Sequence, residues 1–153
     1  MALQDRAAVA DLVVSIENFN HAERECALEL IDIYLDDQGQ ADYRVDVAED
    51  SASRVHGYAC WGPVPLTKGT FDLYWIATNP ASRRAGFGRA LIRHVGKQVL
   101  ENKGRLLVVE TSAKDSYAGT VKFYQDLGYE ETSRVKDFYD VGDDRLIFLK
   151  KLS

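Results

Sequence analysis

A segment rich in glycine and arginine, between a strand-like run and a long amphipathic stretch, constrains the fold more than any other feature of the sequence. Residues 71–78 have the composition of a strand and are stopped by Asn79-Pro80. Residues 86–101 then place Phe87, Leu91, Val95 and Val99 at helical spacing, and Gly104 closes that helix. The apolar run 106–109 is typical of a strand covered on both faces. Because a strand–helix–strand crossover is right-handed with parallel strands, we expect a parallel unit at the centre of a sheet.

The remaining segments extend this unit into a mixed sheet. Apolar spacing predicts helices over residues 6–19, 21–35 and 117–127, and Gln38-Gly39-Gln40 is expected to end the second. Alternation predicts strands over residues 43–47, 55–61, 131–139 and 145–149. The expected class is α/β (mixed α+β), with about six strands and four flanking helices. A chain of 153 residues suffices for one hydrophobic core, so we expect a single domain over residues 1–153.

Composition and charge exclude several classes of partner. The net charge of −5, with acids and bases interspersed, argues against nucleic acid, which requires a basic face. No run of eighteen apolar residues predicts a membrane span, and the first residues lack a secretory signal, so a cytoplasmic protein is expected. Cys26 and Cys60 have no metal-ligand spacing, and we expect two buried free thiols and no metal.

The segment Ser82-Arg83-Arg84-Ala85-Gly86-Phe87-Gly88-Arg89 has the chemistry of an anion site. Glycines let backbone amides approach a ligand, and a helix N-terminus presents unpaired N–H groups and a partial positive charge. Arg83, Arg84 and Arg89 add full charges, which favours an oxyanion or a polyphosphate. The segment lacks both the Gly-Lys-Ser/Thr of a nucleotide P-loop and the Gly-x-Gly-x-x-Gly of a dinucleotide fold. The alternative is a basic loop that only caps a helix.

Three motifs in order resemble the GNAT superfamily of N-acetyltransferases. Arg83, Gly86 and Gly88 match its signature of Arg or Gln, two residues, Gly, one residue, then Gly or Ala. Residues 73–80 resemble the strand that leads into this loop, and residues 123–129 resemble its Phe-Tyr-x-x-x-Gly-Phe/Tyr motif. The resemblance spans almost the whole chain. It departs from the family at the start, because the chain begins almost directly with a helix and the first strand is short or missing.

The resemblance implies a mode of cofactor binding. The two central strands are expected to separate at their carboxyl ends and to hold the pantetheine arm of acetyl-CoA, the co-substrate, in the gap. Its pantetheine would pair with backbone groups of Trp75, Ile76 and Ala77. Its pyrophosphate would be held by the loop residues Arg83, Arg84, Ala85, Gly86, Phe87, Gly88 and Arg89.

Acyl transfer by direct attack of an amine on the thioester requires a base and an acid but no protein nucleophile. The resemblance implies Tyr124 as the acid, near the thioester sulfur; the alternative is a core aromatic. Glu110, which ends the strand near the thioester, matches a glutamate used by some N-terminal-amine acetyltransferases. Asp72 on the preceding strand is the other candidate base, acting through a water. A half-buried carboxylate at this place would have a raised pKa; alternatively, each forms only a structural hydrogen bond.

Residues for the amine acceptor are expected in the loop around Phe19 and in the closing hairpin, where Tyr139 and Trp75 offer aromatic rings for a cation. Asp143-Asp144 either adds acidic groups to this pocket or forms only a hairpin turn. His56 and His94 are assigned to a strand and a helix surface, and His21 to a helix cap.

The expected function is an N-acetyltransferase that acts on a primary amine, a small molecule or an amino acid rather than a protein, as a monomer or homodimer. The alternatives are a non-catalytic CoA-binding module and a protein N-terminal or lysine acetyltransferase.

Overall fold

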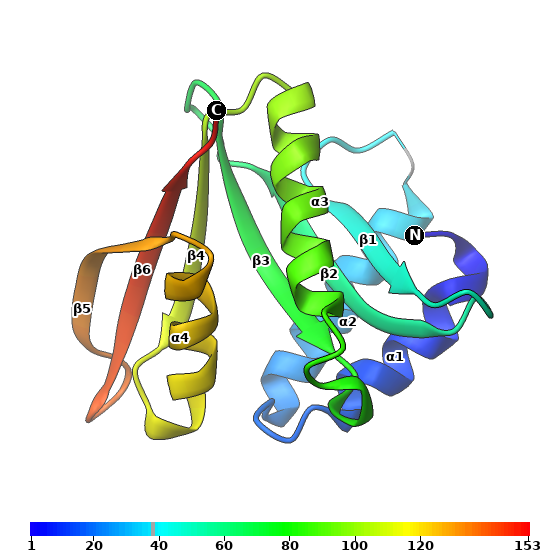
Figure 1. Ribbon diagram of the computed structural model, residues 1–153, viewed down its shortest axis with the longest axis horizontal. Coiled ribbons are helices and arrows are strands. Elements are labelled where there is room, and N and C mark those ends of the chain that lie inside the picture. Colours follow the sequence, from blue (N-terminus) through cyan, green and yellow to red (C-terminus); the bar gives the residue numbers. More distant parts are fainter. Residues whose placement is uncertain (38) are drawn as a thin grey trace.

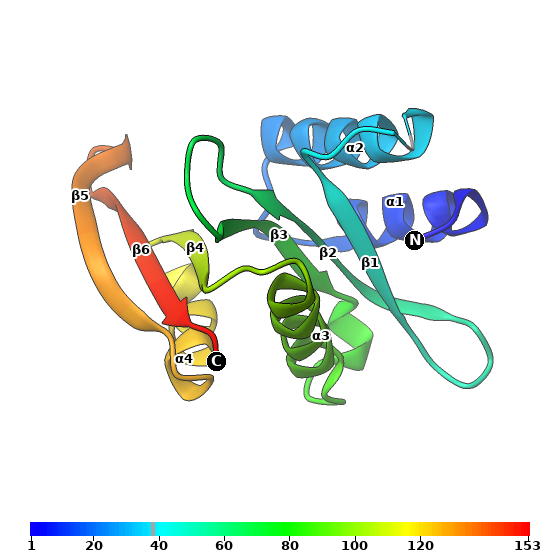
Figure 2. The same cartoon turned by 90° about the horizontal axis from the view of Figure 1, so that it is seen from above.

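The protein contains a six-stranded mixed sheet with helices on both faces (Figures 1 and 2). The structure is a computed structural model that describes residues 1–37 and 39–153. The strand order is β1-β2-β3-β4-β6-β5. Strands β3 and β4 pair in parallel, and the other neighbouring pairs are antiparallel. The predicted parallel unit within a mixed sheet is therefore confirmed.

The elements lie close to their predicted positions. The strands are β1 (Arg44–Glu49), β2 (Val55–Pro63), β3 (Thr70–Thr78), β4 (Leu106–Ser112), β5 (Glu130–Asp140) and β6 (Asp143–Lys151). The helices are α1 (Arg6–Ser15), α2 (His21–Asp36), α3 (Phe87–Glu101) and α4 (Ala118–Asp126). No strand precedes α1 in the described chain, as the departure from the family pattern implied. Of the segment expected to end the second helix, Gln38 lies outside the described residues.

Helices α1 and α2 form one layer against β1–β3 (Figure 2). The guanidinium of Arg6 donates to both carboxylate oxygens of Asp32 at 2.8 Å, which joins the two helices. Helix α1 is shorter than predicted and ends at Ser15. The cap role assigned to His21 belongs to Asn20, which accepts from the Glu23 amide at 2.9 Å. Asparagine is the better cap because its short side chain reaches the free amides of the first turn.

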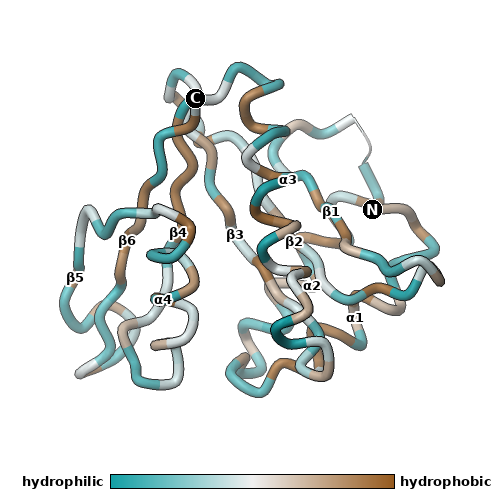
Figure 3. The backbone as a smooth tube through the Cα atoms, in the orientation of Figure 1, coloured by the Kyte–Doolittle hydropathy of each residue, from teal (hydrophilic) through white to brown (hydrophobic). Residues whose placement is uncertain are grey.

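Two apolar clusters fill the spaces on either side of the sheet. The cluster under α3 and α4 contains the helix residues Leu91, Val95 and Val99, as predicted, whereas Phe87 is only half-buried. The cluster under α1 and α2 includes Val9, Leu12, Val13, Ala27, Ile31, Val45, Tyr58 and Cys60. Figure 3 shows β4 as mainly hydrophobic and much of β5 as hydrophilic, in line with their central and edge positions.

Strand β4 is covered on one face only, contrary to the prediction from its apolar run. Leu107 and Val109 are buried, whereas Leu106 and Val108 are half-buried and Glu110 is exposed. Helices α1 and α2 lie over β1–β3 and leave this face of β4 and β6 without a helix in the described chain (Figure 2). The open face gives a ligand access to the side chains of β4.

Three smaller findings concern residues with predicted environments. Cys60 is buried, but Cys26 is exposed on α2, so the prediction of two buried thiols is wrong for Cys26. The closing turn is shorter than predicted, because Asp143 and Asp144 belong to β6. Over residues 1–37 and 39–153, no helix combines the length and the apolar character needed to cross a membrane.

Candidate active site

The two central strands separate part-way along their length. The parallel pairing of β3 with β4 runs from Thr70–Leu106 to Leu73–Val109 and stops there, although both strands continue. Figure 1 shows β3 and β4 diverging toward the N-terminal end of α3. At the same point β3 contains a bulge, since Trp61 opposes Leu73 and Cys60 opposes Trp75, which leaves Tyr74 as the extra residue. A bulge interrupts the ladder and bends its strand, which explains why pairing with β4 ends at Leu73.

Beyond the bulge, β3 has one free edge. Trp75, Ile76 and Ala77 pair with Cys60, Ala59 and Tyr58 of β2. Their other edge has no strand partner in the described chain, because β4 has already diverged. Extended backbone with unpaired N–H and C=O groups binds an extended ligand as an added strand would. The three predicted cofactor residues thus lie together on an edge without a strand partner in the described chain.

The bulge also changes the direction of the side chains. Regular alternation would place Tyr74 and Trp75 on opposite faces, yet both pack against the cluster under α1 and α2. The ring of Phe19, from the loop between α1 and α2, meets the Trp75 indole edge-on with centroids 5.0 Å apart. The predicted acceptor residue Phe19 therefore contacts the predicted cofactor residue Trp75.

The loop after β3 presents several free amides. Within this segment, the amides of Arg83, Ala85 and Ala90 donate to carbonyls at 3.4, 3.2 and 2.9 Å. In the part of the chain that the structure describes, no acceptor pairs with the other amides of the loop, which are those of Arg84, Gly86, Phe87, Gly88 and Arg89. Gly86 caps α3 without a side-chain hydrogen bond, so the first turn of the helix is open to an anion.

The conformation and charge of this loop fit the same ligand. Gly86 has φ 91° and Arg84 has φ 67°, both in the left-handed region. A Cβ at Gly86 would meet no atom within 4 Å, so the backbone conformation rather than crowding favours glycine there. Arg83, Arg84 and Arg89 are exposed, and none of them pairs with a carboxylate of the described residues. Their charges are available to a phosphate.

Tyr124 lies inside the cluster between α4 and the sheet. Its ring centroid is 5.6 Å from that of Tyr129 and 6.0 Å from that of Phe148, and the side chain is buried. Burial raises the pKa of Tyr124 well above its usual range, so the phenol keeps its proton. Its hydroxyl forms no hydrogen bond within the described chain. It is thus a protonated donor without a competing protein partner.

Asp72 and Glu110 differ in environment although they influence each other. Burial, and secondarily the charge of Glu110, raise the pKa of the half-buried Asp72. Asp72 has no hydrogen-bond or ion-pair partner among the described residues. Glu110 is exposed rather than half-buried as expected, and its Oε2 is 3.5 Å from Nη1 of Arg145. The raised pKa predicted for a carboxylate of this site is found at Asp72.

The acceptor side is bordered by two loops in contact. The Asn18 side chain donates to the Ser116 carbonyl at 3.1 Å, and the Tyr117 hydroxyl donates to the Asn18 carbonyl at 3.2 Å. These bonds join the loop between α1 and α2 to the segment before α4. Tyr139 is partly exposed on β5, and after burial the charge of Glu110 is the next cause that raises its pKa.

Asp143 and Asp144 have structural partners. Asp143 is buried, accepts a hydrogen bond from the Ser112 hydroxyl and pairs with Lys114 at 3.1 Å. Burial opposes ionisation of Asp143, but these two partners hold its pKa below the usual value. Asp144 pairs with Arg134 at 3.2 Å and accepts from the Asp137 amide. These contacts give both carboxylates structural roles at the start of β6, in place of the acidic pocket.

Sequence and structure comparisons lead to the same family. The model of the GNAT acetyltransferase domain matches residues 41–131. A crystal structure from Desulfovibrio desulfuricans, of a protein assigned to the acetyltransferases of the GNAT family, superposes with a TM-score of 0.92 and 39% identity. The match covers 99% of this chain and 94% of that one. The chain belongs to the GNAT family of acetyltransferases. It is accordingly an acyl-CoA-dependent N-acetyltransferase.

More distant structures share the fold of this acetyltransferase. The ribosomal-protein-S18-alanine N-acetyltransferase from Escherichia coli has a TM-score of 0.78 and 21% identity, covering 100% of this chain and 91% of that one. An aminoglycoside 6'-N-acetyltransferase complexed with coenzyme A has a TM-score of 0.73 and 15% identity, over 95% and 89% of the two chains. Among curated proteins, no sequence matches the chain significantly.

In this GNAT acetyltransferase, His56 forms a cluster of contacts that the sequence did not predict. His56 is half-buried, not a strand-surface residue, and its imidazole contacts Ser82 and Asp50. His94, in contrast, is partly exposed on α3, as predicted. The contact could not be predicted from a local pattern, because Ser82 and His56 are 26 residues apart and are brought together by the fold.

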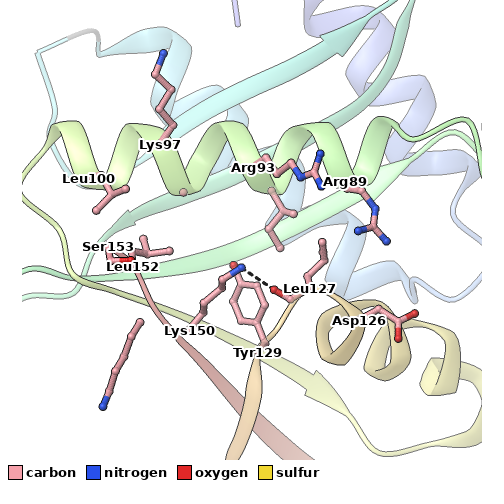
Figure 4. A pocket seen from close by; sticks show the side chains of 13 residues that line it. Arg89, Arg93, Lys97, Leu100, Asp126, Leu127, Tyr129, Lys150, Leu152 and Ser153 are labelled. Carbon is pink, nitrogen blue, oxygen red and sulfur yellow. Dashed lines mark hydrogen bonds between the residues drawn. The ribbon is translucent and has the colours of Figure 1, made fainter.

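A basic groove of about 490 Å³ runs along the acetyltransferase between α3 and the end of β6 (Figure 4). Of the residues predicted to bind the cofactor, Arg89 alone lines this groove in the described chain, and its other α3 residues lie further along the helix. Its cations include Arg93 and Lys97, and Lys150 donates to the Leu127 carbonyl at 2.6 Å. Because it is removed from Asp72 and Glu110, we assign it no chemical step. Among the described residues, no group of three His, Cys, Asp or Glu side chains could hold a metal.

Proposed function

We propose that residues 1–153 form a single acyltransferase domain that moves an acetyl group from acetyl-CoA to the primary amine of a small molecule or an amino acid. The observation that carries this proposal is the free edge of β3 at Trp75–Ala77, which leads directly into a loop of unpaired amides. The edge suits the amide groups of pantetheine, and the loop suits a pyrophosphate. Two free cysteines are compatible with the reducing cytoplasm expected from the sequence.

In the proposed reaction, the amine nitrogen attacks the thioester carbonyl carbon directly. The acceptor first loses a proton, because an ammonium has no lone pair for the attack. Asp72 or Glu110 takes this proton, directly or through a water. The raised pKa of Asp72 brings its proton affinity closer to what a base needs near neutral pH.

Collapse of the tetrahedral intermediate breaks the carbon–sulfur bond, and the thiolate of CoA leaves. We assign Tyr124 as the acid that donates a proton to this sulfur. Its raised pKa keeps the phenol protonated before the reaction, and its hydroxyl has no competing bond in the described chain. The attacking nitrogen loses its second proton as it becomes the amide, and this proton restores the Tyr124 phenol through solvent. The products are the N-acetylated amine and free CoA, and one proton remains on the carboxylate.

A small acceptor is favoured by the contacts that border the site. Asn18 and Tyr117 tie two loops together near the diverging strands, which narrows the approach from that side. Phe19, Trp75 and Tyr139 supply aromatic rings for a cationic acceptor, and Glu110 supplies negative charge. The open face of β4 is the feature that favours the second candidate, an acetyltransferase that acts on a protein N-terminus.

Two measurements test the proposal. Acetyl-CoA should raise the melting temperature, because a ligand that binds only the folded state stabilises it. No shift at millimolar acetyl-CoA would overturn the cofactor assignment. A panel of amines, amino acids and short peptides, followed by release of free CoA, then identifies the acceptor. Turnover of peptides alone would support the second candidate instead.

A further inference from the structure

The imidazole of His56, at the start of β2, is held on three sides. Its Nδ1 is 2.7 Å from the Ser82 hydroxyl oxygen, and its Nε2 is 3.0 Å from Oδ2 of Asp50. The ring stacks on Phe87 with centroids 4.4 Å apart and an interplanar angle of 7°. The two hydrogen bonds fix the ring within its plane, and the stack fixes it perpendicular to that plane. The side chain of His56 is therefore fixed in orientation, although the sequence predicted only a residue on a strand surface.

Asp50 sets the orientation of this imidazole. Its carboxylate accepts hydrogen bonds from the Ala52 amide at 2.9 Å and from the Arg54 amide and Nε at 3.1 and 2.8 Å. The hydrogen bonds from His56 and Arg54 hold the pKa of Asp50 well below its usual range, so it stays ionised. An ionised carboxylate accepts the proton of Nε2, and this bond directs the other ring nitrogen, Nδ1, at the Ser82 hydroxyl.

The contacts of His56 hold the cofactor loop at three successive places. The His56 carbonyl accepts from the Asn79 amide at 2.8 Å, where β3 ends. The imidazole holds Ser82, whose carbonyl accepts from the Ala85 amide at 3.2 Å inside the loop. The stack holds Phe87, the first residue of α3. One residue of a neighbouring strand therefore supports the beginning, the middle and the end of the loop.

We propose that His56, oriented by Asp50, is a positioning residue for acetyl-CoA, which presets the loop from Ser82 to Phe87 with its free amides facing the pyrophosphate. The inference rests on the proposed function. A loop that is already ordered loses less conformational entropy when its ligand binds, so affinity rises without any contact between His56 and the ligand.

The same three side chains do not act as a nucleophilic triad. Serine, histidine and aspartate in this order resemble the groups of a hydrolase. Ser82, however, lies beyond Thr78, the end of β3, whereas Asp72 lies six residues earlier on that strand. At about 3.3 Å per strand residue, Asp72 and Thr78 are separated by about 20 Å, and Ser82 follows Thr78 in the chain. Ser82 is thus at the pyrophosphate end of the site, away from the reacting carbon.

Binding of CoA, measured by titration calorimetry, tests the inference without knowledge of the acceptor. Loss of the hydrogen bond and the stack in His56→Ala should weaken CoA binding about tenfold. Ser82→Ala should weaken it about threefold to fivefold, whereas Ser82→Thr, which keeps the hydroxyl, should stay within about twofold of the wild type. In the double variant His56→Ala/Ser82→Ala, the losses should not add, because both changes remove the same hydrogen bond.

His94→Ala is the matched control, since His94 also pairs with an aspartate, Asp46, at 3.5 Å, but forms no hydrogen bond with Ser82 and no ring stack with Phe87 in the described chain. It should bind CoA like the wild type. Hydrogen exchange adds an independent readout, because the hydrogen-bonded loop amides of Ser82, Arg83 and Ala85 should exchange faster in His56→Ala while those of the central strands do not. If His56→Ala does not fold, the comparison of Ser82→Ala with Ser82→Thr decides.

The outcomes separate the two proposals. If the wild type binds no CoA, the proposed function fails. If the wild type binds CoA, but Ser82→Ala and His56→Ala bind it equally well, only the positioning role of His56 is wrong. Equal losses in Ser82→Thr and Ser82→Ala would also overturn it, because a role that does not depend on the hydroxyl is not the one inferred.

Discussion

The ring of Phe19 meets the indole of Trp75 edge-on, with centroids 5.0 Å apart. Phe19 comes from the loop between α1 and α2, and Trp75 from the part of β3 that has separated from β4. This contact links the loop expected to read the acceptor with the strand edge expected to bind the cofactor. A change in one ring therefore affects the surroundings of the other.

Phe19→Ala should raise the KM for the amine at least several-fold while the affinity for CoA changes little. The substitution removes an aromatic wall of the acceptor site, whereas the backbone edge at Trp75 keeps its pairing with Cys60. Steady-state kinetics with the amine found by the panel, together with calorimetry of CoA, measures both effects. A weaker CoA affinity with an unchanged KM for the amine would assign Phe19 to the cofactor instead.

Gly86→Ala should weaken CoA binding more than Gly88→Ala. At φ 91° a side chain at position 86 costs about 1–2 kcal/mol, although its Cβ has free space. A Cβ at Gly88 would lie 3.5 Å from Phe123 and Thr78, which is ordinary contact at a helical position. Calorimetry with CoA compares the two variants. Equal affinities would show that the left-handed conformation of Gly86 is not needed for binding.

Tyr124→Phe should lower kcat by at least tenfold and leave the affinity for CoA within about twofold, because removal of a general acid typically costs 10²–10⁴ in rate. The ring itself remains, so its packing on Tyr129 and Phe148 is preserved. Melting temperature serves as the check on folding. An unchanged kcat would remove Tyr124 from the mechanism and leave it as a core aromatic.

Asp72→Asn should stabilise the protein at pH 7 while impairing turnover. Burial raises the pKa of Asp72 in the folded state, so the folded protein binds this proton more tightly than the unfolded chain. The linked stability is present below the unfolded pKa and is lost as the pH rises through the raised folded value. Thermal unfolding should therefore show a higher melting temperature for Asp72→Asn at neutral pH, and the gain should shrink toward pH 4.

Glu110→Gln distinguishes the two candidate bases. It removes the charge that helps raise the pKa of Asp72, so that pKa should fall toward its usual value. Carboxyl NMR titration of Asp72 measures this shift directly. If Glu110 is the base, turnover in Glu110→Gln is lost at every pH; if Asp72 is, activity persists and its acidic limb moves to lower pH.

Local patterns account for most of the elements that were predicted correctly. The spacing of Leu91, Val95 and Val99 predicted the buried face of α3, and Asn79-Pro80 predicted the end of β3. Prediction was weaker where neighbours decide burial. The apolar run 106–109 predicted a strand covered on both faces. One face is open because α1 and α2 cover β1–β3 and not β4, and no local pattern in the sequence predicts that placement.

The site itself divides in the same way. Gly86, Gly88 and the arginines of the loop could be proposed from the sequence as an anion site, because conformational freedom and charge belong to the residues themselves. The sequence could not decide whether Asp72 or Glu110 is the carboxylate with the raised pKa, because a pKa depends on burial and on charges from other strands. The partners of His56 were hidden for the same reason.

The sequence by itself thus determined the parallel unit and the family and predicted an anion-binding loop, since periodicity, turn residues and motifs are local properties of the chain. Only the tertiary structure decided which residues meet. It showed that a bulge at Tyr74 ends the pairing of β3 with β4, that Asp143 pairs with Ser112 and Lys114, and that His56 supports the loop at Ser82 and Phe87. These contacts join residues distant in the chain, and their energies exist only once the sheet has formed.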